Sequence, residues 1–172
     1  MLRPRSLRHA ALILALMASP AAFAASYTFD NGGFRFDVPD GWSRIMQTRG
    51  DPETVVYQVP DTSPTGKTVL ARVSVTSKQV RDITDFQAFV ASDAAHAQVL
   101  PDFQLDKDRS SPTTFHYTAS EGGIEQTYVT HNYFHDGHAV QIRCVRPSHS
   151  EAGAEWTRHF DEGCAAITSA LR

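Results

Sequence analysis

The 172-residue sequence lacks the motifs that identify most enzymes and most nucleic-acid-binding proteins. It has no G-x-S-x-G nucleophile elbow, no G-x-x-x-x-G-K-[ST] phosphate loop, no G-x-G-x-x-G turn and no H-E-x-x-H zinc motif. Its basic residues are scattered rather than clustered, which disfavours binding to nucleic acid or to an anionic membrane surface. We therefore predict no catalytic residue, no cofactor and no nucleic-acid partner, and an enzyme of unrecognised type is the least favoured function.

Long apolar runs are also scarce, and the one near the start of the chain is short. Three arginines precede this run and an A-x-A cleavage site follows it, at Arg3, Arg5 and Arg8, residues 10–18, and Ala22-Phe23-Ala24. The pattern predicts a secretory signal peptide over residues 1–24, because a membrane-spanning helix needs about 20 apolar residues. Neither a twin-arginine motif nor a cysteine for lipidation accompanies it, so we expect a periplasmic or secreted protein without a membrane anchor.

The expected mature chain has the size of one ordinary domain. Removing the first 24 of the 172 residues leaves 148, and it removes three arginines, which changes the formal net charge from −3 to −6. The sequence contains no internal repeat, heptad pattern or low-complexity segment. It therefore predicts a single domain over residues 25–172, and it does not indicate an oligomeric state.

Cysteine occurs only twice, at Cys144 and Cys164. Two cysteines in an exported chain predict a disulfide bond. Cys144 lies on the apolar side of an alternating strand, His138 to Val145, and Cys164 lies in the apolar stripe of a following helix, which a capping box over Ser148 to Glu151 should begin. The stripe consists of Trp156, Phe160, Cys164, Ile167 and Leu171. Packing of this helix on the sheet would bring the two sulfur atoms within bonding distance.

Alternating apolar residues separated by turn signals predict mostly antiparallel strands. We expect a first hairpin around Asn31-Gly32-Gly33 and strands over residues 34–38, 54–59, 67–77, 103–108, 113–119, 124–134 and 138–145. A second capping box, Thr84 to Gln87, should begin a helix that ends near Gln98. This order of elements predicts an α+β fold: a central, mostly antiparallel β-sheet with flanking helices and the C-terminal helix packed on the sheet.

The dipeptide Asp136-Gly137 predicts a two-residue hairpin turn and thereby sets a register. Counting outward from the turn pairs Phe134 with Ala139, Tyr133 with Val140, His131 with Ile142 and Val129 with Cys144. The face that carries Cys144 should receive the C-terminal helix. The opposite face mixes aromatic and polar groups as interface centres do, and its predicted binding residues are Tyr128, Asn132, Phe134, Gln141 and Arg143.

The helix that begins near Thr84 is an alternative cover for that face. If its apolar residues Phe86, Phe89 and Val90 pack there, the predicted binding residues become ordinary core. The binding surface would then consist of the loops at residues 49–53, 60–66 and 135–138.

Histidines gather at the same hairpin. His135 and His138 face each other across the turn with about 5 Å between their Cβ atoms, whereas His131 is about 13 Å further along the strand. A zinc or copper site could begin from this pair and Asp136, but it would need a third or fourth ligand. We expect solvated turn histidines, a hydrogen-bonded His131 at the edge of the core, and no required metal.

Three short motifs together are typical of one superfamily: Phe34-x-Phe36-x-Val38-Pro39-x-Gly41-Trp42, Tyr133…Asp136-Gly137…Val140-Gln141-Ile142 and a C-terminal Ile167-x-Ser169-x-Leu171. On these residues the chain resembles the PsbP-like superfamily, which includes extrinsic photosystem II subunits, a Ran-binding import factor, DcrB-type bacterial envelope proteins and adaptor chaperones for secreted effectors. The resemblance implies an α/β/α sandwich with a binding role rather than catalysis, and it transfers no functional residue. This chain lacks the lipidated cysteine of many envelope relatives, and its expected export distinguishes it from the cytoplasmic chaperones.

Two classes of function fit these observations. The first is an exported non-enzymatic envelope protein that binds a protein partner as an inhibitor, immunity factor or assembly factor. The second is a small-molecule or metal-binding periplasmic module, which only the histidine turn and the aromatic positions support. An exposed aromatic cluster would favour the first class, a deep enclosed pocket the second, and convergent His, Asp and Ser side chains an enzyme.

Overall fold

The computed structural model describes residues 25–30 and 34–171, so the predicted signal peptide and the Asn31-Gly32-Gly33 turn lie outside the described residues. The elements, in chain order, are β1 (Ala25–Thr28), β2 (Arg35–Val38), β3 (Ser43–Thr48), β4 (Glu53–Gln58), α1 (Pro64–Thr68), β5 (Arg72–Gln79), α2 (Ile83–Gln98), β6 (Gln104–Leu105), β7 (Thr114–Glu121), β8 (Ile124–His135), β9 (His138–Pro147) and α3 (Gly153–Ser169). Among the described helices, none has the length and apolar character needed to cross a membrane.

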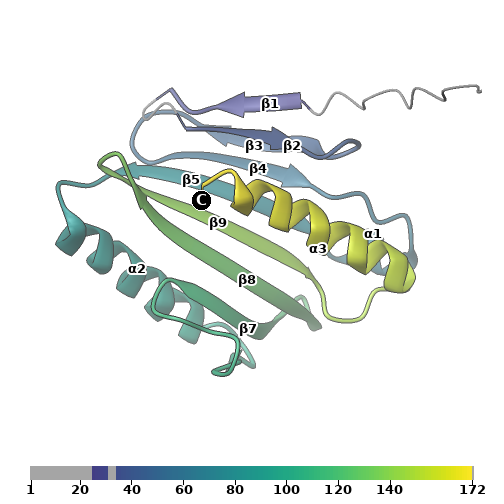
Figure 1. The fold of residues 1–172 in the computed structure, drawn as a ribbon. Coiled ribbons are helices and arrows are strands. Elements are labelled where there is room, and N and C mark those ends of the chain that lie inside the picture. The colour runs from purple at the N-terminus through teal and green to yellow at the C-terminus, as the bar shows by residue number, and fades with distance from the viewer. Residues whose placement is uncertain (1–24, 31–33, 172) are drawn as a thin grey trace, which may run out of the picture.

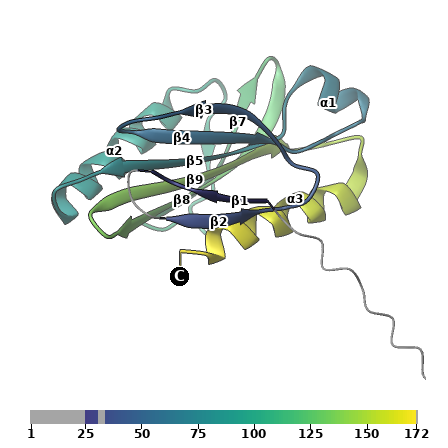
Figure 2. The same cartoon turned by 90° about the horizontal axis from the view of Figure 1, so that it is seen from above.

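Seven strands form one antiparallel sheet in the order β3-β4-β5-β9-β8-β7-β6, and β1 and β2 form a separate two-stranded sheet. The β1–β2 sheet and α3 cover one face of the large sheet, and α2 lies on the other face (Figures 1 and 2). The predicted α+β class, the mostly antiparallel central sheet and the packing of the C-terminal helix on it are confirmed.

The longest pair of neighbouring strands, β8 and β9, has the predicted register. Asp136 and Gly137 adopt φ values of 46° and 75°, the left-handed conformations that a two-residue hairpin turn needs. Phe134 pairs with Ala139 and Val129 pairs with Cys144. Because side chains alternate between faces along a strand, this register places Cys144 on the α3 side and Arg143 on the α2 side.

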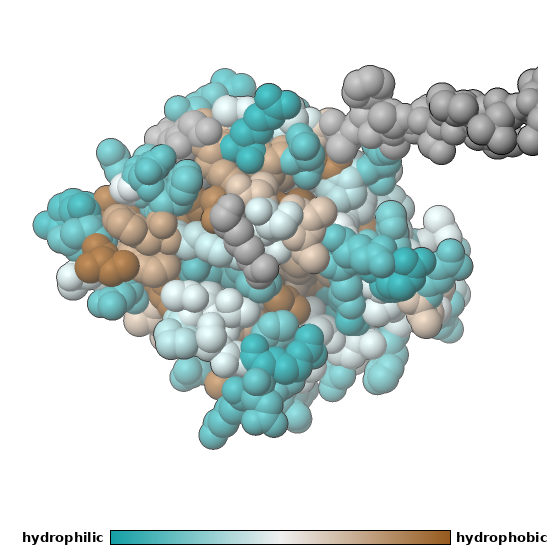
Figure 3. All heavy atoms as spheres, viewed as in Figure 1, coloured by the Kyte–Doolittle hydropathy of each residue, from teal (hydrophilic) through white to brown (hydrophobic). Residues whose placement is uncertain are grey.

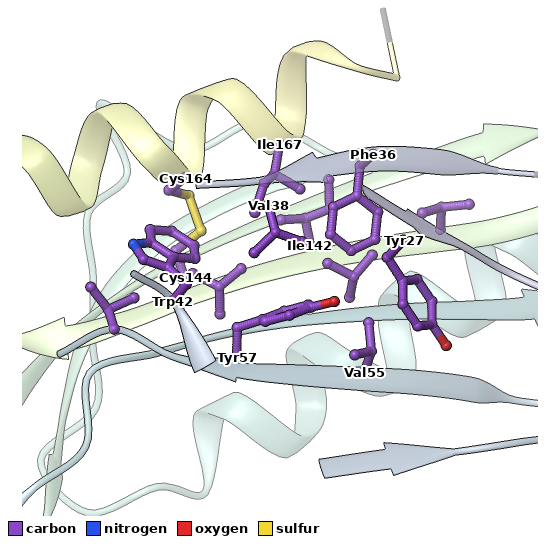
Figure 4. Packing of buried hydrophobic residues seen from close by; sticks show 14 of the residues in the cluster. Tyr27, Phe36, Val38, Trp42, Val55, Tyr57, Ile142, Cys144, Cys164 and Ile167 are labelled. Atoms are coloured by element: carbon purple, nitrogen blue, oxygen red, sulfur yellow. A yellow bond between two sulfur atoms is a disulfide. The ribbon is translucent and has the colours of Figure 1, made fainter. Parts of the chain in front are cut away.

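The main core lies between the large sheet, α3 and the β1–β2 hairpin (Figure 4). Three residues of the predicted helical stripe, Phe160, Cys164 and Ile167, are buried there. A disulfide joins Cys144 to Cys164, whose Cα atoms are 6.3 Å apart, as predicted. Trp42 stacks on Phe160 with 6.1 Å between the ring centroids. The disulfide therefore lies inside the layer that fastens α3 to the sheet.

A buried hydrogen-bond cluster fastens the N-terminal hairpin to the large sheet. The Tyr27 hydroxyl donates to Oε1 of Glu53 at 2.8 Å, and the Asp30 amide donates to Oε2 of the same carboxylate at 3.0 Å. Gln47 of β3 donates to the Tyr27 hydroxyl oxygen at 3.0 Å. Burial, together with the neighbouring Glu53 carboxylate, raises the pKa of Tyr27. Glu53 is only 1% exposed, so these bonds satisfy a carboxylate that would otherwise be costly to bury.

Helix α2 packs on one end of the opposite face. Phe86 and Val90 are buried against Val80 and Ala139, and the ring centroids of Phe86 and Phe134 are 5.9 Å apart. The apolar side predicted for this helix is therefore correct. The helix covers part of the face on which we placed the binding residues.

Both predicted capping boxes are wrong. Helix α2 begins one residue before Thr84, and its N-cap is Asp82, whose Oδ1 accepts from the Thr84 and Asp85 amides at 2.8 and 3.0 Å. Helix α3 begins at Gly153 without a side-chain cap. The Ser148 hydroxyl, the predicted cap, instead forms a hydrogen bond with the Thr127 hydroxyl at 3.0 Å. The Ser150 hydroxyl donates to Asp61 at 2.7 Å and fastens the loop between β9 and α3 to the loop that precedes α1.

Three elements differ from the prediction elsewhere. Residues 64–68 form the short helix α1, with Pro64 in its first turn, so β5 begins at Arg72 rather than at residue 67. The strand expected over residues 103–108 shortens to the two residues of β6. Strand β3 was not predicted at all, because five of its six residues are exposed and no apolar alternation marks it.

Candidate binding cleft

Helix α2 leaves part of its face of the sheet uncovered, and a cleft of about 590 Å³ opens there. Its floor comes from β4, β5, β9 and β8, and α2 forms one wall. Its lining combines apolar, hydroxyl, aromatic and charged side chains: Met46, Val56, Leu100, Ala97 and Val145; Thr54, Ser74, Thr76 and Ser120; Tyr117, Tyr128, His96 and Gln141; Arg72, Arg143 and Glu121. On the side of the molecule drawn in Figure 3, hydrophilic and hydrophobic residues are interleaved.

Two stacked tyrosines form the aromatic part of the cleft. Tyr117 of β7 and Tyr128 of β8 are directly paired, and their rings are nearly parallel, with 4.6 Å between centroids and 8° between planes. The Tyr128 hydroxyl donates to Oε2 of Glu121 at 3.3 Å. Burial and the nearby Glu121 carboxylate raise the pKa of Tyr128 to about 12, and burial raises the pKa of Tyr117. Both rings are therefore neutral near pH 7.

Each of the two cleft arginines pairs with a carboxylate. Arg143 of β9 forms an ion pair with Asp93 of α2, and its Nε donates to the Thr130 hydroxyl at 3.3 Å. Arg72 of β5 approaches Glu121 to 2.8 Å. These partners fix both guanidinium groups and balance their charges. The cleft therefore presents preorganised donors and acceptors without a large excess of either charge.

The structure brings together three of the five predicted binding residues. Tyr128, Gln141 and Arg143 line the cleft. Asn132 is buried and holds its neighbours, because it accepts from Gln141 Nε2 at 3.1 Å and donates to the Thr113 carbonyl at 3.3 Å. Phe134 is 44% exposed but lies against Phe86, and it does not line the cleft. A binding role for the five residues stays a prediction.

The sequence did not predict most of the residues that form the cleft floor and the wall across from α2. The alternation in β5 did place Arg72, Ser74 and Thr76 on the face away from the main core, which was the one signal for them. Glu121 and Tyr117 carried no signal, because their proximity to Arg72 and Tyr128 depends on strand order. In that order, β9 and β8 lie between β5 and β7.

The two histidines of the turn at residues 135–138 both lie near Asp136. His138 Nδ1 lies 2.9 Å from the Asp136 carbonyl oxygen, and His135 Nε2 lies 3.5 Å from the Asp136 carboxylate. Within residues 25–30 and 34–171, no group of three or more His, Cys, Asp or Glu side chains is placed to hold a metal ion. His131 makes a hydrogen bond with the Thr114 hydroxyl at 3.3 Å, which confirms the expected neighbour contact.

The cleft is suited to binding by contact and hydrogen bonding. The Thr54 and Thr76 hydroxyls form a hydrogen bond with each other at 3.0 Å, and the carboxylates of Asp93 and Glu121 are paired with arginines. Among the described side chains, no hydrogen bond joins His96 to a hydroxyl or a carboxylate of the cleft. The described cleft residues thus do not form a hydrogen-bonded pair of nucleophile and base.

Comparison with known proteins identifies the fold and not a family. No protein-family model matches the chain, and no curated protein sequence matches it. The Pseudomonas aeruginosa protein PA94, which is of unknown function, has a similar structure, with a TM-score of 0.52 and 14% sequence identity over 87% of this chain and 96% of that one. LpqN of Mycobacterium tuberculosis, described as involved in cell envelope biogenesis, aligns with a TM-score of 0.47 and 18% identity over 89% of this chain and 84% of that one. Neither is described as PsbP-like, so membership in that superfamily stays a prediction.

Proposed function

We propose that this protein is an exported, non-enzymatic protein of the cell envelope that binds a protein partner through the cleft between α2 and the sheet. The observation that carries the proposal is the partly covered sheet face, where the cleft combines two tyrosines, two arginines and apolar side chains. Tyrosine and arginine are enriched among the residues that dominate binding energy in protein interfaces. The partner would be one that this protein inhibits, neutralises or helps to assemble.

The rigidity of the cleft supports a binding role. Ion pairs and hydrogen bonds already fix Arg72, Arg143, Tyr128 and Gln141 before any partner arrives. A partner would therefore lose little affinity to the ordering of these side chains. The Cys144–Cys164 disulfide similarly fixes α3 on the opposite face.

The proposed location depends on the predicted signal peptide and is consistent with the disulfide, which persists in oxidising compartments. The intact mass of the native protein tests it. A mass that corresponds to a start at or near Ala25 supports export, and a mass that retains residues 1–24 contradicts it.

A small-molecule ligand is the second candidate, and the volume of the cleft is the one observation that favours it. About 590 Å³ lies within the range of roughly 300 to 1,000 Å³ that small-molecule sites occupy. In this case the ligand would contact the Tyr117–Tyr128 pair and hydrogen-bond to Gln141. Binding of a small molecule would then compete with binding of any protein at the cleft.

Site-specific photo-cross-linking in envelope extracts tests the proposal. A photoreactive residue at Thr76, which lines the cleft, should cross-link to a discrete protein, whereas the same group at Ala165, exposed on α3, should not. The Ser74→Tyr variant, which fills the cleft, should abolish the Thr76 cross-link without changing the melting temperature. Equal cross-linking from both positions, or turnover of a defined substrate by the pure protein, would contradict the proposal.

A further inference from the structure

Strand β3 forms one edge of the seven-stranded sheet, beside the cleft. It pairs with β4 on one side, and no described strand pairs with its other side. An edge strand of this kind exposes a row of backbone N–H and C=O groups that another extended chain can bind. With six residues, β3 offers about 20 Å of such an edge.

β3 also presents apolar side chains at this edge. Ile45 and Met46 are 46% and 48% exposed, so two large apolar residues stand in the centre of the edge. The strand contains neither proline nor lysine, two residues that protect edge strands, although the β3–β4 register shifts between Arg44 and Met46, so the edge is irregular at Ile45. Met46 also lines the cleft, which makes the edge and the cleft parts of one surface.

Two positive charges flank the apolar centre. Arg44 and Arg49 are exposed, and neither lies within ion-pair distance of a carboxylate in the described part of the chain. The segment from residue 43 to residue 49 contains no acidic residue. A segment that pairs with β3 would therefore gain from carboxylates near both of its ends.

We propose that the protein partner binds by adding an extended segment to β3 as an eighth strand of the sheet, with acidic residues at the ends of that segment opposite Arg44 and Arg49. The proposal rests on the proposed function and specifies the chemistry of the partner. Alternate side chains of the added strand would lie beside Met46 and continue into the cleft. The intervening side chains would lie on the side of the β1–β2 hairpin.

A second copy of this chain is a poorer occupant of the same edge. Pairing of β3 with itself would bring Arg44 and Arg49 of both copies to one seam, and no acidic residue of that segment would neutralise them. Concentrated like charge at a strand pair is destabilising. The charge pattern therefore favours a different, acidic partner.

The test begins with a random peptide library displayed on phage and selected against the disulfide-intact protein. Synthetic peptides from the selection should have alternating apolar residues between two acidic ends. Their Kd should rise about tenfold in the Arg44→Glu/Arg49→Glu variant, because two exposed ion pairs become repulsive. Arg109→Glu is the control, since Arg109 is also exposed and has no ion pair within the described residues but lies beside β6 and β7, at the opposite end of the sheet, and it should change the Kd less than twofold.

Backbone pairing needs its own readout. Methylation of alternate backbone nitrogens of the peptide should abolish binding for one set of positions and leave it intact for the other. Amide hydrogen exchange should slow within residues 43–48 when the peptide binds, and an unchanged melting temperature of the double variant would show that it still folds.

Three results would overturn strand addition. The first is a selection that enriches no peptide, and the second is peptides that bind equally well to the double variant and after methylation. The third is slowed exchange in β3 that depends only on protein concentration, which would identify a second copy as the occupant. If the Thr76 cross-link persists in the double variant, the proposed function stands and the strand-addition mode is wrong.

Discussion

Arg143 of β9 and Asp93 of α2, 50 residues apart in the sequence, form the ion pair that joins the helix to the sheet at the cleft wall. Their side chains are 28% and 14% exposed, so water screens the pair only in part. The Thr130 hydroxyl accepts from Nε of the same guanidinium at 3.3 Å, which fixes its orientation. This ion pair holds α2 against the sheet together with the apolar packing of Phe86, Val90 and Ala97.

Charge reversal at this pair should loosen α2. Arg143→Glu would place two carboxylates together in a partly buried site, and we expect it to lower the free energy of unfolding by about 2–4 kcal/mol. The double variant Arg143→Glu/Asp93→Arg should recover most of that loss. Urea unfolding measures both values, and an Arg143→Glu protein as stable as the native one would show that the pair does not hold the helix.

Reduction of the disulfide should destabilise the domain. Cys144 and Cys164 are separated by 20 residues in the sequence, and the chain-entropy estimate for a loop of that length is about 3 kcal/mol. For a domain of this size that corresponds to a decrease in Tm of about 10 °C. Calorimetry with and without reductant measures it, and the Cys144→Ala/Cys164→Ala variant is the control for reductant effects. Free thiols in the native, unreduced protein would contradict the disulfide.

Gly163 permits the close approach of α3 to Trp42. A Cβ atom at residue 163 would lie 2.5 Å from the Trp42 ring and 3.1 Å from Pro39. Alanine inside a helix is usually more stable than glycine by about 1 kcal/mol, but overpacking here should outweigh that gain and give a net loss of about 1–3 kcal/mol.

Thermal unfolding of Gly163→Ala checks this prediction. The double variant Trp42→Phe/Gly163→Ala should relieve part of the clash, so its loss should be smaller than the sum of the two single losses. Stabilisation by Gly163→Ala alone would mean that α3 lies further from Trp42 than described.

Because the pKa of Tyr128 is raised, we expect the stability of the protein to fall at alkaline pH. The pKa of Tyr128 is raised from 10.0 to about 12 in the folded protein, by burial first and then by Glu121. The neutral phenol therefore favours the folded state fully below pH 10, and this contribution is lost as the pH rises from 10 to 12. An ultraviolet titration of the native protein should contain a phenol step near pH 12 that Tyr128→Phe removes. Loss of a step near pH 10 instead would show that Tyr128 is exposed.

Local sequence signals predicted the hairpin and the disulfide because neighbouring residues determine them. Asp136 and Gly137 set the turn, the turn set the register of β8 and β9, and the register placed Cys144 on the α3 face. The helical stripe then placed Cys164 on the facing side of α3.

The cleft could be predicted only in part because distant contacts form it. Arg72 and Glu121 are 49 residues apart, and only the strand order brings them within 2.8 Å. The contact between Asp93 and Arg143 helps to place α2 on the sheet, and no periodic pattern in the sequence encodes it. Strand β3 was missed for a different reason, since both of its faces are largely exposed and leave no alternation in the sequence.

Binding of the cross-linked partner to three purified proteins is the most direct test of the central claim that the cleft binds a protein. Calorimetric titration would compare the native protein, the cleft-filling Ser74→Tyr variant and the matched Ala165→Tyr variant on the exposed side of α3. We predict that Ser74→Tyr abolishes binding while Ala165→Tyr binds as the native protein does, with all three equally stable. Equal affinity for all three proteins would contradict the account.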